Sequence, residues 1–569
     1  MRRVQPNYPP QEKTLSSKDK IVIVGGVAGG ASCAARCRRL NESAEIVIID
    51  RGPYVSFANC GLPYYVGDVI TDESTLLVAS AALFHDRFNI EVRTQHEALA
   101  VDPAAKEIDV KDLTTGRVYR ERYGALVLSP GAYALRPALP GVDLPGVFVL
   151  RTIPDSRRIR AWISEKNAKS AVIVGAGFIG LEMAENLARR GLSVSILEML
   201  DQVMPTLDPE MARPVRQHLE QHGVTTALGD GVAGFESLDG HLVVHTQSGA
   251  SHVGDLVILA IGVRPETGLA TSAGLTLGER GGIRVDEQMR TSDPHIWAVG
   301  DAVEVRDIVT GQWALIPLAG PANRQGRVAA DVICGRDSRF RGVQGTAICG
   351  VFGLTVAITG ASEKGLQRAG ITDYQKVYLH PGHHVSYFPG ATPINIKLIF
   401  RPSDGRILGA QAVGEADVDK RIDVIATAIQ LGGTVFDLEE AELCYAPQFG
   451  GAKDPVNYAG MVAANHLRGD LPLADWAQLT KESALLVDVR DRDEFEAGHI
   501  SGAINLPLND IRHRLAELPR DREIWLYCGV GQRAYYATRL LMQNGFTVRN
   551  LAGGFRTYNL IAKVGGSNQ

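Results

Sequence analysis

The sequence of 569 residues predicts an α/β fold. The two observations behind this prediction are the clustering of glycine and the alternation of strand-like and helix-like segments around the clusters. Glycine is frequent, with 61 residues, and it gathers in clusters that follow short apolar runs and precede helix-like segments. The alternation of a strand, a glycine-rich turn and a helix is typical of α/β domains. The 45% hydrophobic and 22% charged fractions are those of an ordinary globular protein and argue against disorder.

Length, charge and cysteine content narrow the class of protein. At about 150 residues per domain the chain has room for three or four domains. A net charge of -5 gives no basic footprint for nucleic acid, and no apolar run reaches the ~18 residues of a membrane helix. Residues 1–19 lack the apolar segment of a secretory signal, so we expect a flexible extension there. Seven widely spaced cysteines do not form a disulfide framework, so we expect a cytoplasmic location.

The first glycine cluster predicts a dinucleotide-binding turn. A helix is expected from about residue 29 to 40, and a second strand at 45–49 ends at Asp50, 20 residues after Gly30. The start of such a helix holds a pyrophosphate, and the terminal acid accepts a hydrogen bond from a ribose hydroxyl. Position three of the motif is Val27 instead of glycine, so a plain structural turn is the alternative.

The second cluster is a complete G-x-G-x-x-G motif formed by Gly175, Gly177 and Gly180. Its helix is expected to continue to about residue 190, and the next strand, 193–197, ends at Glu198. An acid there favours a free 2′-hydroxyl, and Met199 follows where an arginine could have bound a 2′-phosphate. We therefore expect NADH in preference to NADPH. Two such units in one chain indicate a flavoprotein that passes hydride from nicotinamide to flavin.

Further segments resemble the flavoproteins that have two dinucleotide-binding domains. The run T-S-D-P-H-I-W-A-V-G-D, which ends at Asp301, resembles their second FAD motif, and the blocks around Gly131 and Gly262 resemble their connecting turns. The resemblance covers roughly residues 20–465. It implies an FAD-binding domain at 20–150 and 280–344, an NAD(H)-binding domain at 151–279 and an α+β dimerisation domain at 345–468.

The resemblance also implies the residues that hold the two cofactors. For FAD they are Gly25, Val27, Ala28, Gly30, Asp50, Pro130, Gly131, Asp301 and Ala319. For NADH they are Gly175, Gly177, Ile179, Gly180, Glu198 and Gly262. We expect no metal ion.

One cysteine is the candidate redox residue. Cys60 lies in the string S-F-A-N-C-G-L-P-Y, and the positions five residues to either side are Val55 and Tyr65, so no internal disulfide can form there. A single redox thiol works through a mixed disulfide, a persulfide or a sulfenic acid. The string resembles the coenzyme A disulfide reductase group and its NADH oxidase and peroxidase relatives. A lowered pKa is expected for Cys60, and a buried inert thiol is the alternative.

Resemblance to the same group implies further site residues. The hydroxyls of Tyr387 and Tyr445 are expected to reach across a homodimer interface to Cys60 of the other subunit, with interface packing as the alternative. The residues implied for coenzyme A are Arg36, Arg39, Ser56, Asn59, Lys420 and Arg421. The remaining cysteines are expected to be packing residues, namely Cys33, Cys37, Cys334, Cys349 and Cys444.

The C-terminal part, residues 473–563, resembles an α/β rhodanese domain. Its strings D-V-R and G-H-I-S-G-A-I-N lead to Cys528, which a strand delivers into a loop above a helix that starts at about Arg533. Backbone N–H groups in such a loop stabilise a thiolate or persulfide anion. The loop residues are Gly529, Val530, Gly531, Gln532 and Arg533. A regulatory module without sulfur transfer is the alternative.

Together the parts resemble the NADH-dependent persulfide reductases of the coenzyme A disulfide reductase–rhodanese fusion type. This resemblance implies that Cys60 attacks coenzyme A persulfide or polysulfide, with FAD, NADH and coenzyme A as cofactors and a sulfur-carrying Cys528. Two alternatives stay open. One is a coenzyme A disulfide reductase for thiol homeostasis, and the other is a redox or sulfide sensor with negligible turnover.

Overall fold

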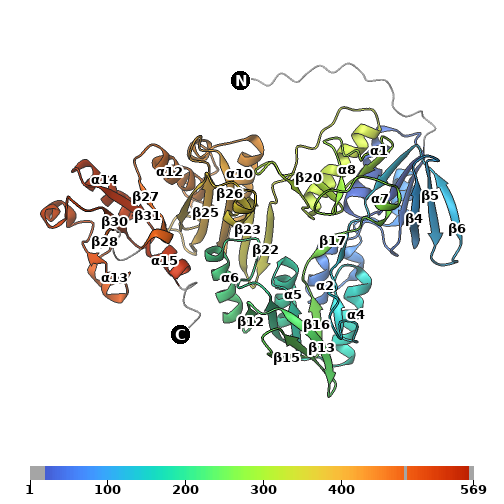
Figure 1. Cartoon of the computed structure of the whole chain (residues 1–569), viewed down its shortest axis with the longest axis horizontal. Coiled ribbons are helices and arrows are strands. Elements are labelled where there is room, and N and C mark those ends of the chain that lie inside the picture. The colour runs from blue at the N-terminus through green and yellow to red at the C-terminus, as the bar shows by residue number, and fades with distance from the viewer. Residues whose placement is uncertain (1–19, 480–483, 563–569) are drawn as a thin grey trace. The chain divides into compact units, whose positions relative to one another are not determined.

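The computed structural model describes residues 20–479 and 484–562, which fall into two units (Figure 1). The first unit comprises residues 20–197 and 231–343, and the second comprises 198–230, 344–479 and 484–562. The extension expected at residues 1–19 lies outside the described residues. Among the described residues, no helix combines the length and the apolar character that crossing a membrane requires.

A parallel sheet in the first unit carries the first glycine turn. Its centre is β1 (Ile21–Val24), which pairs with β2 (Ile46–Asp50) on one side and β7 (Ala125–Leu128) on the other. All four residues of β1 are buried, as expected of a central parallel strand. The outer strands are β3 (Glu91–Thr94) and β19 (Ile296–Ala298).

Two helices pack together beside this sheet. The helix α1 (Ala28–Leu40) follows β1 directly and contacts α8 (Ala319–Ile333). They approach closely because glycines lie at the crossing, where a Cβ atom on Gly326 would lie only 2.2 Å from the carbonyl oxygen of Gly29. The crossing therefore fixes the N-terminal end of α1, which directly follows the glycine turn.

The second glycine turn belongs to a second parallel arrangement, in which β10 (Ser170–Val174) pairs with β11 (Ser193–Glu198) and β16 (Leu256–Leu259). The turn connects β10 to α5 (Phe178–Arg189), whose apolar face is buried. The strand β9 (Val147–Val149) pairs with β16, and α4 (Ile153–Glu165) begins with a capping box at Thr152.

Smaller elements complete the first unit. The short helices are α2 (Leu62–Val66), α3 (Ala81–Phe88) and α7 (Gly268–Ser272). The remaining strands are β4 (His96–Asp102), β5 (Glu107–Asp112), β6 (Val118–Arg122), β8 (Ala132–Ala134), β13 (Val232–Leu238), β14 (His241–Thr246), β15 (Ser251–Gly254), β17 (Val263–Pro265), β18 (Ile283–Arg284), β20 (Val303–Arg306) and β21 (Trp313–Ala314).

An antiparallel sheet forms the centre of the second unit, in the order β22-β23-β26-β25-β24. Every residue of β25 (Ile394–Phe400) and β26 (Ile407–Gly414) is buried, so helices and loops cover both faces. The other strands are β22 (Ala347–Val351), β23 (Leu354–Gly360) and β24 (Gln375–Leu379). The helices of this part of the unit are α6 (Pro209–Gln221), α9 (Glu363–Arg368), α10 (Val418–Leu431), α11 (Val435–Glu439) and α12 (Pro455–Leu467), and β12 (Thr225–Leu228) pairs with β11.

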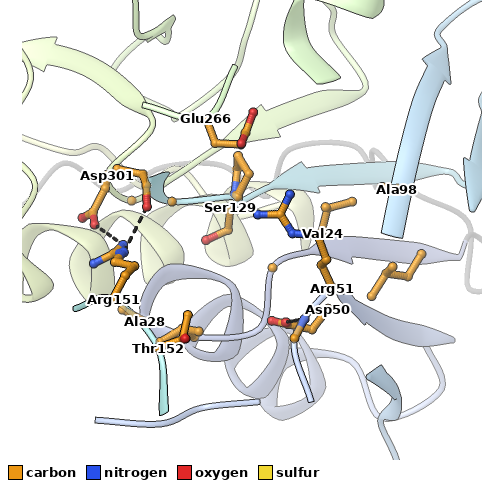
Figure 2. Close-up of a pocket in the computed structure, with 18 of the residues that line it drawn as sticks. Val24, Ala28, Asp50, Arg51, Ala98, Ser129, Arg151, Thr152, Glu266 and Asp301 are labelled. Atoms are coloured by element: carbon orange, nitrogen blue, oxygen red, sulfur yellow. Dashed lines mark hydrogen bonds and ion pairs between the residues drawn. The ribbon is translucent and has the colours of Figure 1, made fainter. Parts of the chain in front are cut away.

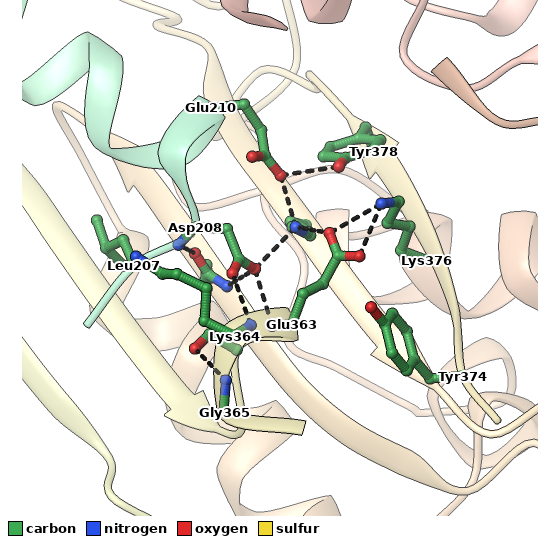
Figure 3. A network of polar contacts seen from close by, with 12 residues as sticks. Leu207, Asp208, Glu210, Glu363, Lys364, Gly365, Tyr374, Lys376 and Tyr378 are labelled. Carbon is green, nitrogen blue, oxygen red and sulfur yellow. Dashed lines mark hydrogen bonds and ion pairs between the residues drawn. The ribbon is translucent and has the colours of Figure 1, made fainter. Parts of the chain in front are cut away.

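A polar network that includes Asp208, Glu210 and Glu363 lies on this sheet (Figure 3). The Lys397 ammonium is fully buried and forms ion pairs with Asp208, Glu210 and Glu363. The Tyr378 hydroxyl donates to Glu210 at 2.8 Å. These three carboxylates lie close enough together to resemble a metal site, but the ammonium already provides their common cation. The network therefore ties α6 and α9 to the sheet.

The last part of the chain forms a parallel sheet in the order β27-β31-β30-β28-β29. Separate apolar clusters pack on it, one of which includes Trp476, Trp525 and Tyr378 of β24. The strands are β27 (Leu473–Ala474), β28 (Leu485–Asp488), β29 (Ile504–Asn505), β30 (Ile524–Tyr527) and β31 (Val548–Leu551), and the helices are α13 (Arg492–Ala497), α14 (Gln532–Gln543) and α15 (Gly554–Ala562).

The α/β class predicted from the sequence is confirmed. The helix expected at 29–40 is α1, and the helix expected to continue to 190 is α5.

Candidate active site

The first glycine turn opens onto a cavity of about 500 Å³. Gly25 has a positive φ of 89°, and a Cβ atom there would lie 2.0 Å from the carbonyl oxygen of Ser129. A Cβ atom on Gly30 would lie 1.8 Å from the carbonyl oxygen of Gly25. Only glycine fits these positions, so the backbone itself faces the cavity at the start of α1. Val27 and Ala28 line it directly.

Asp50 closes the turn from the end of β2. Its carboxylate accepts hydrogen bonds from the N–H groups of Gly26 and Gly52, each at 2.8 Å. Burial raises the pKa of Asp50, and these two hydrogen bonds oppose the rise. The carboxylate lines the cavity, where it is placed to accept from a ribose hydroxyl.

An ion pair lies elsewhere in the same cavity, apart from Asp50 (Figure 2). Arg151 contacts Asp301 at 3.0 Å and donates to the carbonyl of Ala132 at 3.0 Å. Pro130 and Gly131 line the cavity as well. Ala319 instead forms the first residue of α8. The glycine cradle, the acid at the strand end and the aspartate beside Gly300 fit an elongated dinucleotide such as FAD.

The second glycine turn has the same construction. Gly175 has a φ of 106°, and a Cβ atom on Gly180 would lie 2.0 Å from the Gly175 carbonyl oxygen. Around Gly177 nothing lies within 4 Å of a hypothetical Cβ atom, which leaves the turn open to a ligand. Ile179 is 37% exposed beside it. The turn therefore fits the pyrophosphate of a second dinucleotide.

Two other residues implied for nicotinamide binding have distinct local structures. Glu198 is the last residue of β11 and accepts a hydrogen bond from the N–H of Leu200 at 3.0 Å. Met199 beside it is exposed. Gly262 has a φ of 108°, so the turn after β16 also requires glycine. No arginine follows Glu198 directly, in keeping with the expected preference for NADH.

Cys60 lies in the 3-10 turn η1 (Asn59–Gly61), just before α2. The residue is exposed, and its Sγ lies 3.9 Å from the side-chain oxygen of Asn59, which lines the first cavity. Desolvation and the charge of Glu182 raise the pKa of Cys60, while Arg151 acts in the opposite direction. The lowered pKa expected from the sequence is therefore not produced by the surrounding residues. The main reason is desolvation of the thiol, and the charge of Glu182 adds to it.

Glu182 was not predicted from the sequence. It comes from α5, and the Tyr64 hydroxyl donates to its Oε1 at 3.5 Å. Burial raises its pKa to about 7, so this carboxyl exchanges a proton near neutral pH. The only signal in the sequence is an acid in a mainly apolar helix, which does not identify its neighbour. Arg151 was also missed, because nothing beside it in the sequence identifies Asp301 or Cys60 as a neighbour.

Tyr387 and Tyr445 are brought together in the second unit. Their hydroxyls are 2.8 Å apart, and the side chains are 71% and 48% exposed. The hydrogen bond to Tyr445 raises the pKa of Tyr387. Two exposed aromatic residues that share a hydrogen bond provide a proton donor at the surface of this unit.

The residues implied for coenzyme A have very different surroundings. Arg39 is exposed on α1, and Ser56 has a left-handed φ of 48° beside the Cys60 turn. Arg36 is held by Asp331 at 2.7 Å. Lys420, on α10, donates to the carbonyl of Phe449 at 3.1 Å. Among these four residues only Arg39 is exposed, while Ser56, Arg36 and Lys420 are half-buried.

Arg421 is a correction to the coenzyme A assignment. Its side chain is fully buried, and its guanidinium bonds to Asp454 at 2.8 Å and to the carbonyl of His383 at 2.7 Å. If the Arg421 guanidinium moved away, the buried Asp454 would keep, among the described residues, only Lys420, 3.9 Å away, as a cationic partner. Arg421 is a structural cation and does not reach a ligand phosphate in this arrangement.

The other cysteines separate into two groups. Cys33, Cys37 and Cys349 are buried, as expected of packing residues, and Cys334 is half-buried. Cys444 is exposed, which contradicts the expectation of a packing role. It lies in a segment between α11 and α12 that has no regular secondary structure, so no neighbouring element covers it.

The rhodanese-like loop follows β30. Cys528 is 1% exposed, and the N–H of Gly531 donates to its Sγ at 3.2 Å. Gly531 has a φ of 100° and precedes α14, so the Cys528 sulfur lies near a helix N-terminus. Val530 and Gln532 form the exposed rim of the loop. This geometry stabilises a negative charge on sulfur.

Two ion pairs lie beside the Cys528 loop. Arg490 pairs with the buried Asp488 at 2.6 Å. Arg533 bonds to Glu494 at 2.6 and 2.7 Å, and its guanidinium would lie 3.8 Å from a Cβ atom on Gly529. Hydrogen bonds from Arg533 are the largest cause of the lowered pKa of Glu494, so both groups stay charged at neutral pH.

Family comparisons cover most of the chain. The pyridine nucleotide-disulphide oxidoreductase family matches residues 19–326, and the dimerisation domain of that family matches residues 346–454. The rhodanese-like domain family matches residues 473–560. These matches fall on the two glycine turns, the antiparallel sheet and the Cys528 loop.

Similar proteins have related descriptions. The crystal structure of reduced CoADR-RHD from Bacillus anthracis is 48% identical, with a TM-score of 0.94 and coverage of 96% of this chain and 99% of that chain. A NAD-dependent persulfide reductase from A. fulgidus is 37% identical, with a TM-score of 0.87 and coverage of 95% and 100%. A coenzyme A disulfide reductase from Staphylococcus epidermidis is 34% identical over 446 residues, 78% of this chain and 100% of that protein.

Proposed function

Because the chain belongs to the pyridine nucleotide-disulphide oxidoreductase family and carries a rhodanese-like domain, we propose that it reduces persulfide sulfur with NADH. The substrate class is coenzyme A persulfide or polysulfide, and the products are a thiol and sulfide. The observation that carries this proposal is the Cys528 loop, where a glycine N–H contacts a buried sulfur at 3.2 Å. Such a loop suits a sulfane sulfur anion and has no use in simple disulfide reduction.

The two glycine turns are proposed to hold the cofactors. Gly25, Gly30 and Asp50, with Asp301, would hold FAD, and Gly175 and Gly180, with Glu198, would hold NADH. These cofactors supply two electrons, passed from nicotinamide through flavin to sulfur. The acid at Glu198 supports NADH as the preferred nucleotide.

Cys60 is proposed to carry the reaction at sulfur. Its thiolate attacks the S–S bond of the persulfide. Attack on one sulfur expels hydrosulfide and leaves a mixed disulfide, and attack on the other expels the thiolate and leaves a Cys60 persulfide. Either adduct takes up two electrons and two protons, so the net change is one persulfide, NADH and a proton converted to a thiol, hydrogen sulfide and NAD⁺.

Each of the two units contains side chains that are candidates for donating or accepting the protons of this reaction. Glu182, whose pKa is about 7, can hold a proton near Cys60. Tyr387 and Tyr445 are proposed to act from the partner subunit of a homodimer, in keeping with the dimerisation-domain match. Arg39, Ser56 and Asn59 remain proposed contacts for coenzyme A. Seven free cysteines support a reducing compartment such as the cytoplasm.

The experiment compares coenzyme A persulfide, polysulfide and coenzyme A disulfide as substrates, with NADH consumption and sulfide release as readouts. Wild type is measured beside Cys60→Ser and Cys528→Ser, with Cys444→Ser as the matched control because Cys444 is also an exposed thiol. Fast persulfide turnover that is abolished in Cys60→Ser and kept in Cys444→Ser, with loss of polysulfide turnover in Cys528→Ser, supports the proposal. Sulfide release by Cys60→Ser at the wild-type rate would contradict it.

Reduction of coenzyme A disulfide for thiol homeostasis is the second candidate. It is favoured by the Staphylococcus epidermidis relative, which bears that name and aligns over its full length. Fast disulfide turnover without sulfide release would support this function. Negligible turnover on all three substrates would favour the sensor alternative.

A further inference from the structure

The rhodanese-like loop is supported by the antiparallel sheet through two glycines. Gly553 and Gly554 precede the body of α15 with φ values of 71° and 60°. A Cβ atom on Gly554 would lie 2.2 Å from the Cys528 carbonyl oxygen, and one on Gly531 would lie 3.3 Å from the Gly553 nitrogen. The glycine pair therefore lies directly against the backbone of the sulfur-carrying loop.

The first N–H groups of α15 also hold the loop. Phe555 N–H donates to the Cys528 carbonyl at 2.7 Å, and Arg556 N–H donates to the Gly529 carbonyl at 3.0 Å. The position of Cys528, and with it the contact between its Sγ and Gly531, consequently depends on the position of α15.

On its other side the glycine pair meets the end of β24. A Cβ atom on Gly553 would lie 2.9 Å from Tyr378 Cβ and 3.1 Å from His380 Nε2. His380 Nε2 and the hydroxyl of Thr557, which is on α15, are 2.8 Å apart. His380 Nδ1 lies 2.8 Å from Asn395 Oδ1 on β25. All three polar side chains are buried.

These contacts define one protonation state of the imidazole. Nδ1–H donates to the Asn395 oxygen, and Nε2 accepts from the Thr557 hydroxyl, so the ring is neutral and both nitrogens are satisfied. Burial, with a contribution from the charge of Arg556, lowers the pKa of His380 to about 3. The ring therefore remains neutral throughout the physiological pH range. Its hydrogen bond with Thr557 of α15 does not change over that range.

The geometry points to His380 as a positioning residue for sulfur loading of Cys528. The imidazole fixes Thr557 and the start of α15, α15 fixes the Cys528 and Gly529 carbonyls, and the loop then directs the Gly531 N–H at the sulfur. The antiparallel sheet is thereby part of the sulfur-carrying site. This inference rests on the proposed sulfur-carrying role of Cys528.

The step concerned is transfer of one sulfur atom. The Cys528 thiolate attacks the outer sulfur of a persulfide, the S–S bond of the donor breaks, and the donor leaves as a thiolate while Cys528 becomes a persulfide. No electrons are gained or lost overall. Negative charge passes through Sγ, so weakening the Gly531 contact slows this transfer and raises the pH at which the thiol ionises.

The test uses the full-length holoenzyme and the isosteric variant Thr557→Val, which removes only the hydroxyl. Its matched control is Thr538→Val, because the Thr538 hydroxyl is equally buried in this domain but bonds only to its own helix, at the Ala534 carbonyl. Thr557→Ser restores the hydroxyl. Sulfur loading from coenzyme A persulfide is followed by peptide mass, and the pH midpoint of Cys528 alkylation is measured on the same peptide.

Thr557→Val is expected to load Cys528 about three- to tenfold more slowly, the effect of one lost buried hydrogen bond, and to raise the alkylation midpoint. Thr557→Ser and Thr538→Val are expected to match wild type, as is NADH turnover on coenzyme A disulfide in every variant. Asn395→Leu, which lies outside the rhodanese-like domain, is expected to reproduce the slower loading and serves if Thr557→Val does not fold.

The outcomes separate this inference from the proposed function. If wild-type Cys528 takes up no sulfur, the proposed function fails. If wild type loads sulfur and Thr557→Val and Asn395→Leu load it equally fast with the same alkylation midpoint, the role of His380 is overturned. Equal slowing in Thr538→Val would also overturn it, because the effect would then reflect general destabilisation.

Discussion

Replacing Lys397 by methionine tests how the antiparallel sheet of the second unit is held together. The ammonium is fully buried and contacts Asp208, Glu210 and Glu363. Methionine keeps the length and apolar stem but removes the only charge that all three carboxylates share in the described structure. Breaking a buried ion pair in this way costs about 3–5 kcal/mol, because the remaining charges are left buried and uncompensated.

The pH dependence of this loss has a definite sign. Burial acts to raise the pKa of Asp208 and of Glu363, but Lys397, which contributes most among the opposing groups, and the hydrogen-bond and charge partners around it lower the pKa of each. In wild type these groups stabilise the fold above their unfolded pKa values of about 4, and the contribution is lost as the pH falls. In Lys397→Met burial dominates, the folded pKa values rise, and protonation relieves repulsion. The difference between wild type and variant therefore narrows on acidification from pH 7.

The assay is thermal unfolding of the holoenzyme, with hydrogen exchange of β25 peptides to locate the effect in the second unit. At about 2–4 °C per kcal/mol for a unit of this size, the midpoint is expected to fall by roughly 6–20 °C at pH 7. Lys376→Met is the control, because Lys376 also pairs with Glu363 but is partly exposed, and such pairs contribute about 0.2–1 kcal/mol. A loss below about 1 kcal/mol in Lys397→Met, or a difference that widens on acidification, would refute the reasoning.

The remaining predictions concern the active site. Glu182→Gln is expected to lower the pH midpoint of Cys60 alkylation by about half to one unit, because it removes the negative charge that raises the Cys60 pKa most, and an unchanged midpoint would contradict this role. Gly180→Ala places a Cβ atom 2.0 Å from a carbonyl oxygen of its own turn, so KM for NADH is expected to rise at least about tenfold, and steady-state kinetics showing no rise would contradict the close packing. Native-state alkylation followed by peptide mass is expected to modify Cys444 and to spare Cys37 until denaturant is added, and equal rates at the two thiols would show that Cys37 is not buried.

The features predicted well from the sequence are those that consecutive residues determine. The glycine turn at 175–180 needs close backbone approach within a few residues, and that demand is visible as G-x-G-x-x-G. The same is true of the Cys528 loop, where strand, glycine and helix follow one another directly. The α/β class and the family were therefore accessible from sequence alone.

The surroundings of Cys60 could not be predicted, because they come from distant segments. Two residues that act on its pKa are Arg151, which lies just before α4, and Glu182, which lies on α5. Arg421 shows a related difficulty, since a cation in a matching string can be a ligand for phosphate or a buried partner of a carboxylate. Exposure decides between these roles, and a short motif does not encode exposure.

The raised pKa of Cys60 has a consequence for side reactions at its sulfur. Oxidants and alkylating agents attack thiolates far faster than thiols. Desolvation, followed by the charge of Glu182, raises the pKa of Cys60 and so disfavours the thiolate. These surroundings therefore slow unwanted oxidation and alkylation of Cys60 relative to an ordinary surface cysteine.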